Sequence, residues 1–82
     1  MTDHSQSLKI LLVDDHALMR EGLRHIIAQN PAIEVVGEAG NGREALDLVK
    51  TLHPDVILII FVYVYSAADK AYTYTKIISR LR

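Results

Sequence analysis

Two adjacent aspartates, Asp14 and Asp15, follow an apolar run at residues 8–13 and are the side chains best suited to chemistry. A carboxylate pair at the end of a buried strand can hold a hard cation such as Mg²⁺, which prefers oxygen ligands and neutralises phosphoryl groups. Such a site normally takes a further carboxylate from the neighbouring strand. The other strongly apolar run, residues 56–65, contains no acid, and Ile60 occupies the position expected for that carboxylate. The sequence therefore predicts half of a phosphate-chemistry site, without its reactive group.

The elements that must position these aspartates alternate along the chain. Nearly continuous apolar runs at residues 8–13, 33–37 and from 56 onward are typical of buried parallel strands. Apolar residues at helical spacing predict helices at about 17–29 and 41–52, the second beginning with an N-cap and capping box at Asn41 and Glu44. This alternation predicts a parallel α/β sheet with right-handed crossovers.

The last segment is compatible with two structures. A helix over residues 67–81 would place on one face Ala67, Ala71, Tyr74, Ile78 and Leu81. A hairpin with its turn at residues 67–70 would set one pair of tyrosines against another, Tyr63 and Tyr65 against Tyr72 and Tyr74. The hairpin turn lacks the glycine or Asn-Gly pair that tight turns prefer, so we favour the helix and the element order βαβαβα.

The size and composition of the chain exclude several classes of protein. Its 82 residues allow one small domain with a marginal core. A net charge of −1 with no basic cluster argues against nucleic-acid binding, and the lack of cysteine excludes disulfides and thiolate metal sites. The N-terminus has no signal-peptide core, and the run at 56–65 is too short for a membrane helix. We therefore expect a cytoplasmic protein that binds neither nucleic acid nor membranes.

Three ordered blocks of the sequence resemble the receiver domain of response regulators, in the NarL/FixJ group that is usually fused to a LuxR-type output domain. The blocks are ILLVDDHALMREGL at 10–23, VVGEAGNGREAL at 35–46 and PDVILI at 54–59. The resemblance implies a partial flavodoxin-like (CheY-like) three-layer sandwich with parallel strand order 2-1-3. It also implies that Asp14 and Asp15 hold Mg²⁺, while an aspartate ending the third strand takes a phosphoryl group from a sensor histidine kinase.

The resemblance ends at Ile59, because position 60 carries isoleucine where the family has its phosphoacceptor. The family's switch hydroxyl and lysine have no equivalents, and Thr73, Thr75 and Lys76 are not assigned those roles. We divide the chain into a disordered N-terminus at 1–7, a receiver-like half domain at 8–59 and a non-family tail at 60–82. The tail is expected to extend the third strand and then form a helix.

We expect a signalling fragment that is truncated, engineered or chimeric, is not an enzyme and is not phosphorylated at position 60. The alternative is a natural pseudo-receiver that serves a transcriptional regulator as a phosphorylation-independent dimerisation module. For Asp14 and Asp15, the alternative to a residual Mg²⁺ site is an inherited pair that helps to start the following helix. His16 is interpreted as a marker of the subtype at the helix start, without a catalytic role.

The third strand raises the question of what covers it, since the order 2-1-3 leaves it at the edge of the sheet. A long, apolar, uncharged edge strand is a template for pairing with another chain. We therefore expect either a fold-back of the tail or a homo-oligomer that completes the sheet. The residues expected at the oligomer interface are Ile60, Val62, Tyr63, Val64 and Tyr65.

Overall fold

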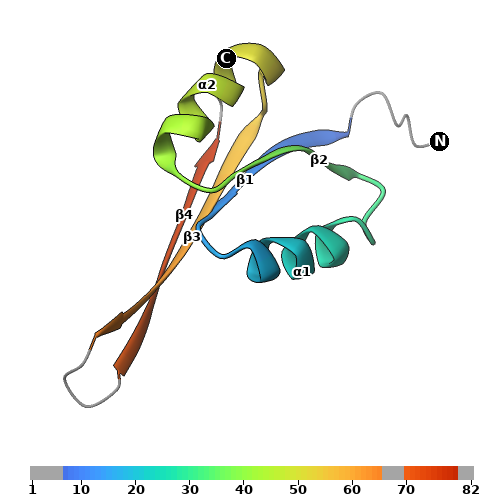
Figure 1. The fold of residues 1–82 in the computed structure, drawn as a ribbon. Helices are drawn as coiled ribbons and strands as arrows, with labels where there is room; N and C mark the ends of the chain where they lie inside the picture. The colour runs from blue at the N-terminus through green and yellow to red at the C-terminus, as the bar shows by residue number, and fades with distance from the viewer. Residues whose placement is uncertain (1–6, 66–69, 80–82) are drawn as a thin grey trace.

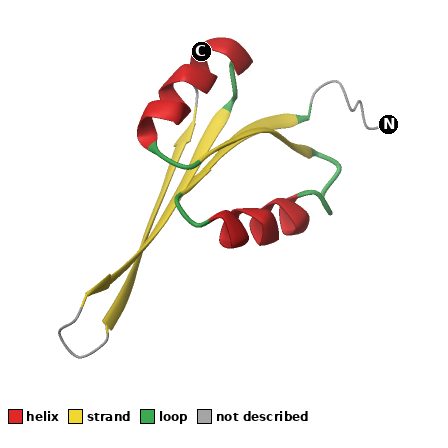
Figure 2. Cartoon of the chain, in the orientation of Figure 1, coloured by secondary structure: helices red, strands yellow, loops and turns green. Residues whose placement is uncertain are grey.

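The computed structural model describes residues 7–65 and 70–79, with the backbone alone at 62–65, 70–74 and 79. Six elements follow one another along the chain (Figures 1 and 2): β1 (Leu8–Asp14), α1 (Ala17–Ile27), β2 (Ile33–Ala39), α2 (Gly42–Leu52), β3 (Val56–Tyr65) and β4 (Lys70–Ser79).

The strands form one four-stranded sheet in the order β2-β1-β3-β4. β1 lies parallel to both β2 and β3, and β4 pairs with β3 in antiparallel orientation. The two helices lie on opposite sides of the parallel part of the sheet (Figure 1). The α/β class, the layered architecture and the order 2-1-3 of the first three strands are thus confirmed.

The helix predicted over residues 67–81 is wrong, since residues 70–79 form β4. The alternative hairpin is the observed arrangement, with Tyr63 opposite Tyr72 along the ladder. The segment is rich in threonine, tyrosine and isoleucine, which favour extended backbone, and β4 pairs with the edge of β3 that would otherwise be open. The proposed turn, at 67–70, lies outside the described residues except for Lys70, and so does the N-terminus at 1–6.

One cluster of buried residues lies between the sheet and α2, while Ile10 and Leu12 are buried on the other face of β1. The buried members of this cluster are Leu11, Val13, Ala39, Ala45 and Ile57, and partly buried residues that pack against them are Leu48, Val49, Ile59, Phe61 and Ile78. Helix and sheet approach closely at Gly37 in β2, where an added Cβ would lie 2.5 Å from Leu52 Cδ1. A larger residue at this position would therefore displace the end of the Leu52 side chain.

Both ends of α2 are fixed by local interactions. Asn41 Oδ1 accepts a hydrogen bond from the Glu44 backbone N–H at 2.9 Å, and Glu44 Oε1 accepts one from the Gly40 N–H, also at 2.9 Å. This is the predicted capping box. The helix ends at His53, whose φ of 50° puts a non-glycine residue in the left-handed region. Local contacts thus define where α2 begins and ends.

Helix α1 packs much less deeply than α2. None of its residues, all of which the structure describes, is buried, and Leu18, Met19 and Ile26 are 82%, 45% and 65% exposed. An apolar groove of about 450 Å³ runs along this face of the helix and begins at His16. Hydrophobic burial alone therefore does not hold α1 against the sheet.

Candidate functional site

The candidate site lies at the carboxyl end of β1, the central parallel strand. Asp14 is the last residue of β1, and Asp15 and His16 form the short connection to α1. Ligands of open α/β sheets bind at this edge, outside the carboxyl ends of the strands. The Asp14 side chain is fully buried, whereas Asp15 and His16 are 48% and 56% exposed, so the site is closed on one side and open to solvent on the other.

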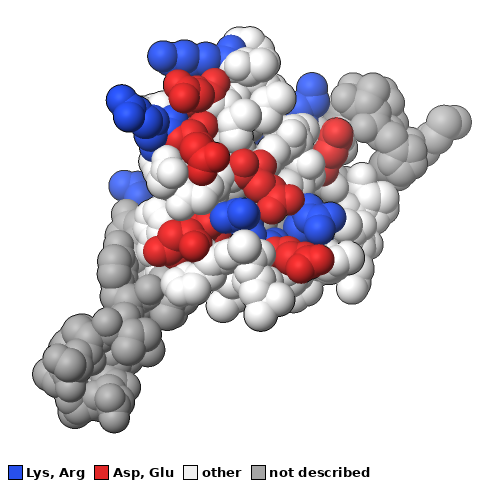
Figure 3. Space-filling model, in the orientation of Figure 1, with Lys and Arg blue, Asp and Glu red and all other residues white. Residues whose placement is uncertain are grey.

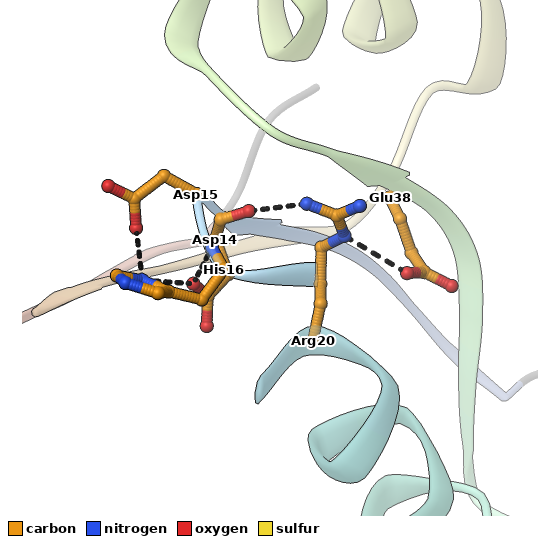
Figure 4. Close-up of polar contacts among 5 residues, drawn as sticks. All are labelled: Asp14, Asp15, His16, Arg20 and Glu38. Carbon is orange, nitrogen blue, oxygen red and sulfur yellow. Dashed lines mark hydrogen bonds and ion pairs between the residues drawn. The ribbon is translucent and has the colours of Figure 1, made fainter. Parts of the chain in front are cut away.

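The three consecutive side chains converge (Figure 4). The His16 backbone N–H donates a hydrogen bond to Asp14 Oδ1 at 2.8 Å. His16 Nδ1 lies 2.9 Å from Asp15 Oδ1 and 3.9 Å from Asp14 Oδ1. The second oxygen of Asp14, Oδ2, is buried and has no hydrogen-bond partner among the described residues. A buried carboxylate oxygen without a hydrogen-bond partner lowers the stability of a folded protein, and Asp14 Oδ2 is such an oxygen.

The Arg20 side chain of α1 holds the end of β1 from the other side (Figure 4). Arg20 Nη1 donates to the backbone carbonyl of Asp14 at 2.6 Å, and its Nε donates to Glu38 Oε1 on β2 at 3.2 Å. Arg24 Nε reaches the other oxygen of Glu38 at 3.0 Å. These partly buried charged contacts connect α1 to β2 and to the end of β1, and so orient the connection that carries the site.

The cluster of Arg20 and Arg24 was not identified from the sequence, because only the apolar residues of the helix were used. The signal that could have identified them is their spacing of four residues, which puts both on one helix face. Glu38, near the carboxyl end of the neighbouring strand, is the acid such a face would meet. Figure 3 shows how closely acidic and basic side chains alternate on the surface drawn there.

Ile60 lies where the sequence placed it. It pairs with Asp14 in the parallel β1–β3 ladder, so the two side chains project from the same face of the sheet. On its other side Ile60 pairs with Thr75 of β4. The structure therefore places Asp14 beside Ile60, with Asp15 next in the chain, and it provides no carboxylate on β3 beside Asp14.

The strand predicted to mediate oligomerisation has its backbone edge paired within the chain. Residues 62–65, which include Val62, Tyr63, Val64 and Tyr65, run antiparallel to residues 70–73 of β4. The expectation that the tail folds back over β3 is thus met. An interface between copies of the chain through these residues stays a prediction.

An open α/β sheet with acidic side chains at the carboxyl end of its central strand is typical of α/β domains that bind their ligands at this edge of the sheet. Within that class, the chain belongs to the response regulator receiver domain family, whose model matches residues 10–59. No described helix is long and apolar enough to cross a membrane.

Several curated proteins are similar to this chain over the same region. Nitrate/nitrite response regulator protein NarL of Escherichia coli is 48% identical over 50 residues, which cover 61% of this chain and 23% of NarL. NarP of the same organism is 49% identical over 51 residues, or 62% of the chain and 24% of NarP. A protein-glutamate methylesterase/protein-glutamine glutaminase of Methanosarcina acetivorans is 46% identical over 52 residues, covering 63% of the chain and 15% of that protein. The chain thus spans no more than about a quarter of the length of these relatives.

Receiver domains act in two-component signalling, bind Mg²⁺ at an acidic site and interact with sensor histidine kinases. The residues present here fit Mg²⁺ in part, because Asp14 and Asp15 supply carboxylate oxygens. Mg²⁺ requires near-octahedral oxygen coordination, but the donors that gather within 4.8 Å are two carboxylates and the imidazole of His16. The neighbouring strand contributes Ile60, which has no donor atom. The protein therefore supplies two carboxylate donors and one nitrogen donor, and Mg²⁺ there would take its remaining ligands from water.

Proposed function

We propose that this chain is a receiver-type unit of a two-component signalling system that does not take up a phosphoryl group at position 60. The observation that carries the proposal is the pairing of Ile60 with Asp14 in the β1–β3 ladder. An aliphatic side chain occupies the place from which the family's acceptor would attack, and it has no nucleophilic atom. The unit is not an enzyme, acts in the cytoplasm and descends from partners of sensor histidine kinases.

The segment from position 60 onward supports an altered receiver. The family match stops at residue 59, and the chain continues through an extended β3 into the antiparallel strand β4. Because β4 is antiparallel to β3 and follows it after a short connection, the series of parallel strands joined by helices stops at β3. We propose that residues 60–82 are a non-family segment, joined to an ancestral receiver by chimerism or engineering.

The second candidate is a natural pseudo-receiver that acts as a phosphorylation-independent dimerisation or interaction module of a transcriptional regulator. The observation that favours it is the apolar exposure of α1, where Leu18 is 82% and Ile26 65% exposed. Exposed apolar side chains grouped on one helix face mark interaction surfaces more often than scattered ones do. In this case the chain itself does not contact DNA, and its contribution to the regulator is the assembly of two copies.

Phosphorylation in vitro separates an inactive acceptor position from an active one. The protein is incubated with acetyl phosphate and Mg²⁺, and the products are analysed by intact mass and peptide mapping. The expected result is no adduct in the wild-type chain, with beryllofluoride likewise failing to bind. A stoichiometric phosphoryl adduct on an acid near the strand ends, such as Asp14 or Asp15, would overturn the proposal.

Sedimentation velocity distinguishes the two candidates. A pseudo-receiver that works by assembly is dimeric, and Leu18→Glu shifts it to monomer, whereas Leu46→Glu on α2, which is 67% exposed, is the matched control. A wild-type chain that sediments as a monomer at all concentrations contradicts the dimerisation module. It leaves the first candidate in place.

A further inference from the structure

We infer that the outer edge of β4 pairs with the same strand of a second copy of this chain, in antiparallel orientation, so that two four-stranded sheets join into one. The oligomer interface expected from the sequence was the end of β3, whose edge β4 now covers. The β4 edge is also distinct from the exposed face of α1 considered above. The inference does not depend on either candidate function.

The first observation is that β4 ends the sheet on one side. The strand order is β2-β1-β3-β4, and none of the described elements pairs with the outer edge of β4. The β3–β4 pair extends well beyond both helices, so much of this edge is accessible (Figure 1). The backbone N–H and C=O groups along an open edge are a template for a further strand. The partner at this edge is therefore an extended segment.

The second observation is the difference between the two edges of the sheet. At the opposite edge, β2 is 7 residues long and carries Glu34 and Glu38, and its pairing with β1 shifts register between Ile10 and Leu11. Short length, charge and irregular pairing are the devices that protect an edge. In contrast, β4 is 10 residues long, pairs with β3 without a shift and has one charged residue, Lys76, between its end residues. The β4 edge is therefore the less protected of the two.

The third observation is the exposure of the side chains along this edge. Thr75, Lys76 and Ile77 are exposed, and Ile77 is a large apolar residue with 66% of its surface open to solvent. Thr75 and Ile77 are two positions apart and so lie on one face of the sheet. Side chains on one face contact those of the neighbouring strand. A further strand beside β4 thus removes apolar surface of Ile77 from water.

The charges of β4 are compatible with a second copy as the partner. A two-fold axis perpendicular to the joined sheet pairs the two strands symmetrically about one residue, and the overlap of residues 70–79 is longest when that residue is Tyr74 or Thr75. These registers place Lys76 opposite Tyr72 or Tyr74, so no lysine of one strand is opposite a lysine of the other. Two-fold pairing of identical surfaces closes as a dimer and is the commonest symmetry of homo-oligomers. The strand therefore meets the charge requirement for pairing with itself.

Sedimentation velocity over a range of concentrations tests for the dimer, with circular dichroism to check the fold of each variant. We expect a monomer–dimer equilibrium in the wild type. Ile77→Lys adds a charge to the edge and should weaken dimerisation by at least about tenfold, because it enters the two-fold interface twice. Thr75→Lys should act in the same way. The matched control is Leu46→Lys, since Leu46 on α2 is 67% exposed, and it should dimerise as the wild type does.

Cross-linking locates the interface within the dimer. The chain has no cysteine, so Thr75→Cys and Leu46→Cys each supply a single thiol. In both registers the two residues at position 75 are opposite or diagonal neighbours within about 8 Å. A short bismaleimide reagent should therefore join Thr75→Cys chains into covalent dimers and leave Leu46→Cys chains unlinked.

Three results would overturn the inference. The first is a wild-type chain that stays monomeric at all concentrations. The second is a dimer that dissociates in Leu18→Glu but persists in Ile77→Lys, which would assign the interface to α1. The third is open-ended assembly without cross-linking of Thr75→Cys chains, the result expected if β4 pairs with β2 of a neighbouring copy.

Discussion

Replacement of Ile60 by aspartate should destabilise the protein through repulsion of Asp14. The two positions are direct neighbours on parallel strands, which lie about 4.8 Å apart. Two carboxylates about 5 Å apart in a medium of effective dielectric constant about 20 repel each other by about 3 kcal/mol. Loss of the half-buried isoleucine adds about 1 kcal/mol. We therefore expect Ile60→Asp to lower the free energy of unfolding by about 4 kcal/mol in the absence of divalent ions.

The matched control is Ile60→Asn, which loses the same apolar contact but adds no charge. Urea unfolding followed by circular dichroism should show the asparagine variant about 3 kcal/mol more stable than the aspartate variant. Mg²⁺ at a hundred times its dissociation constant should restore about 2.7 kcal/mol to the aspartate variant and nothing to the asparagine variant. Equal stability of the two variants, with no response to Mg²⁺, would refute the placement of residues 14 and 60 side by side.

Smaller perturbations test the packing and the helix ends by urea or thermal unfolding. Gly37→Ala should cost about 1 kcal/mol, because its methyl group would lie 2.5 Å from Leu52 Cδ1 and the end of that side chain must move. Gly22→Ala, in an open helical position, should gain about 1 kcal/mol. Similar effects of the two substitutions would contradict the close approach of α2. Asn41→Ala removes the side-chain acceptor that caps α2 and should cost about 1 kcal/mol, so an unchanged melting temperature would argue against that cap. His53→Gly relieves a φ of 50° and should stabilise by up to about 1 kcal/mol, and a loss of stability would show that the histidine side chain contributes more than its backbone conformation costs.

The parallel part of the fold could be predicted from the sequence because local signals agree with one another there. The apolar run before Asp14, the cap at Asn41 and the proline after His53 each mark one end of an element. The last segment was different, since its apolar residues fit a helical stripe while their types favour a strand. The choice between them depends on a long ladder with β3, which is a tertiary contact that local periodicity does not encode.

The candidate site was also predicted only in part. The sequence placed Asp14, Asp15 and Ile60 together because carboxyl ends of adjacent parallel strands meet at one edge. It did not show that Asp14 is fully buried with an unpaired oxygen, or that Arg20 holds its carbonyl group. Both facts depend on side-chain direction and on the way α1 lies against the sheet, which follow from the assembled fold.

The antiparallel pairing of β4 has a consequence for the order in which the chain folds. The β3–β4 ladder joins residues that are close in sequence, from Tyr65 and Lys70 at the turn to Val56 and Ser79 at its far end. The β1–β3 ladder instead joins Ile10 to Val56 across two helices and a strand. Closing a short loop costs less chain entropy than closing a long one, so β3 can find β4 before it finds β1. The longest apolar strand of the protein thus acquires a partner early, and it spends less of the folding time exposed to other chains.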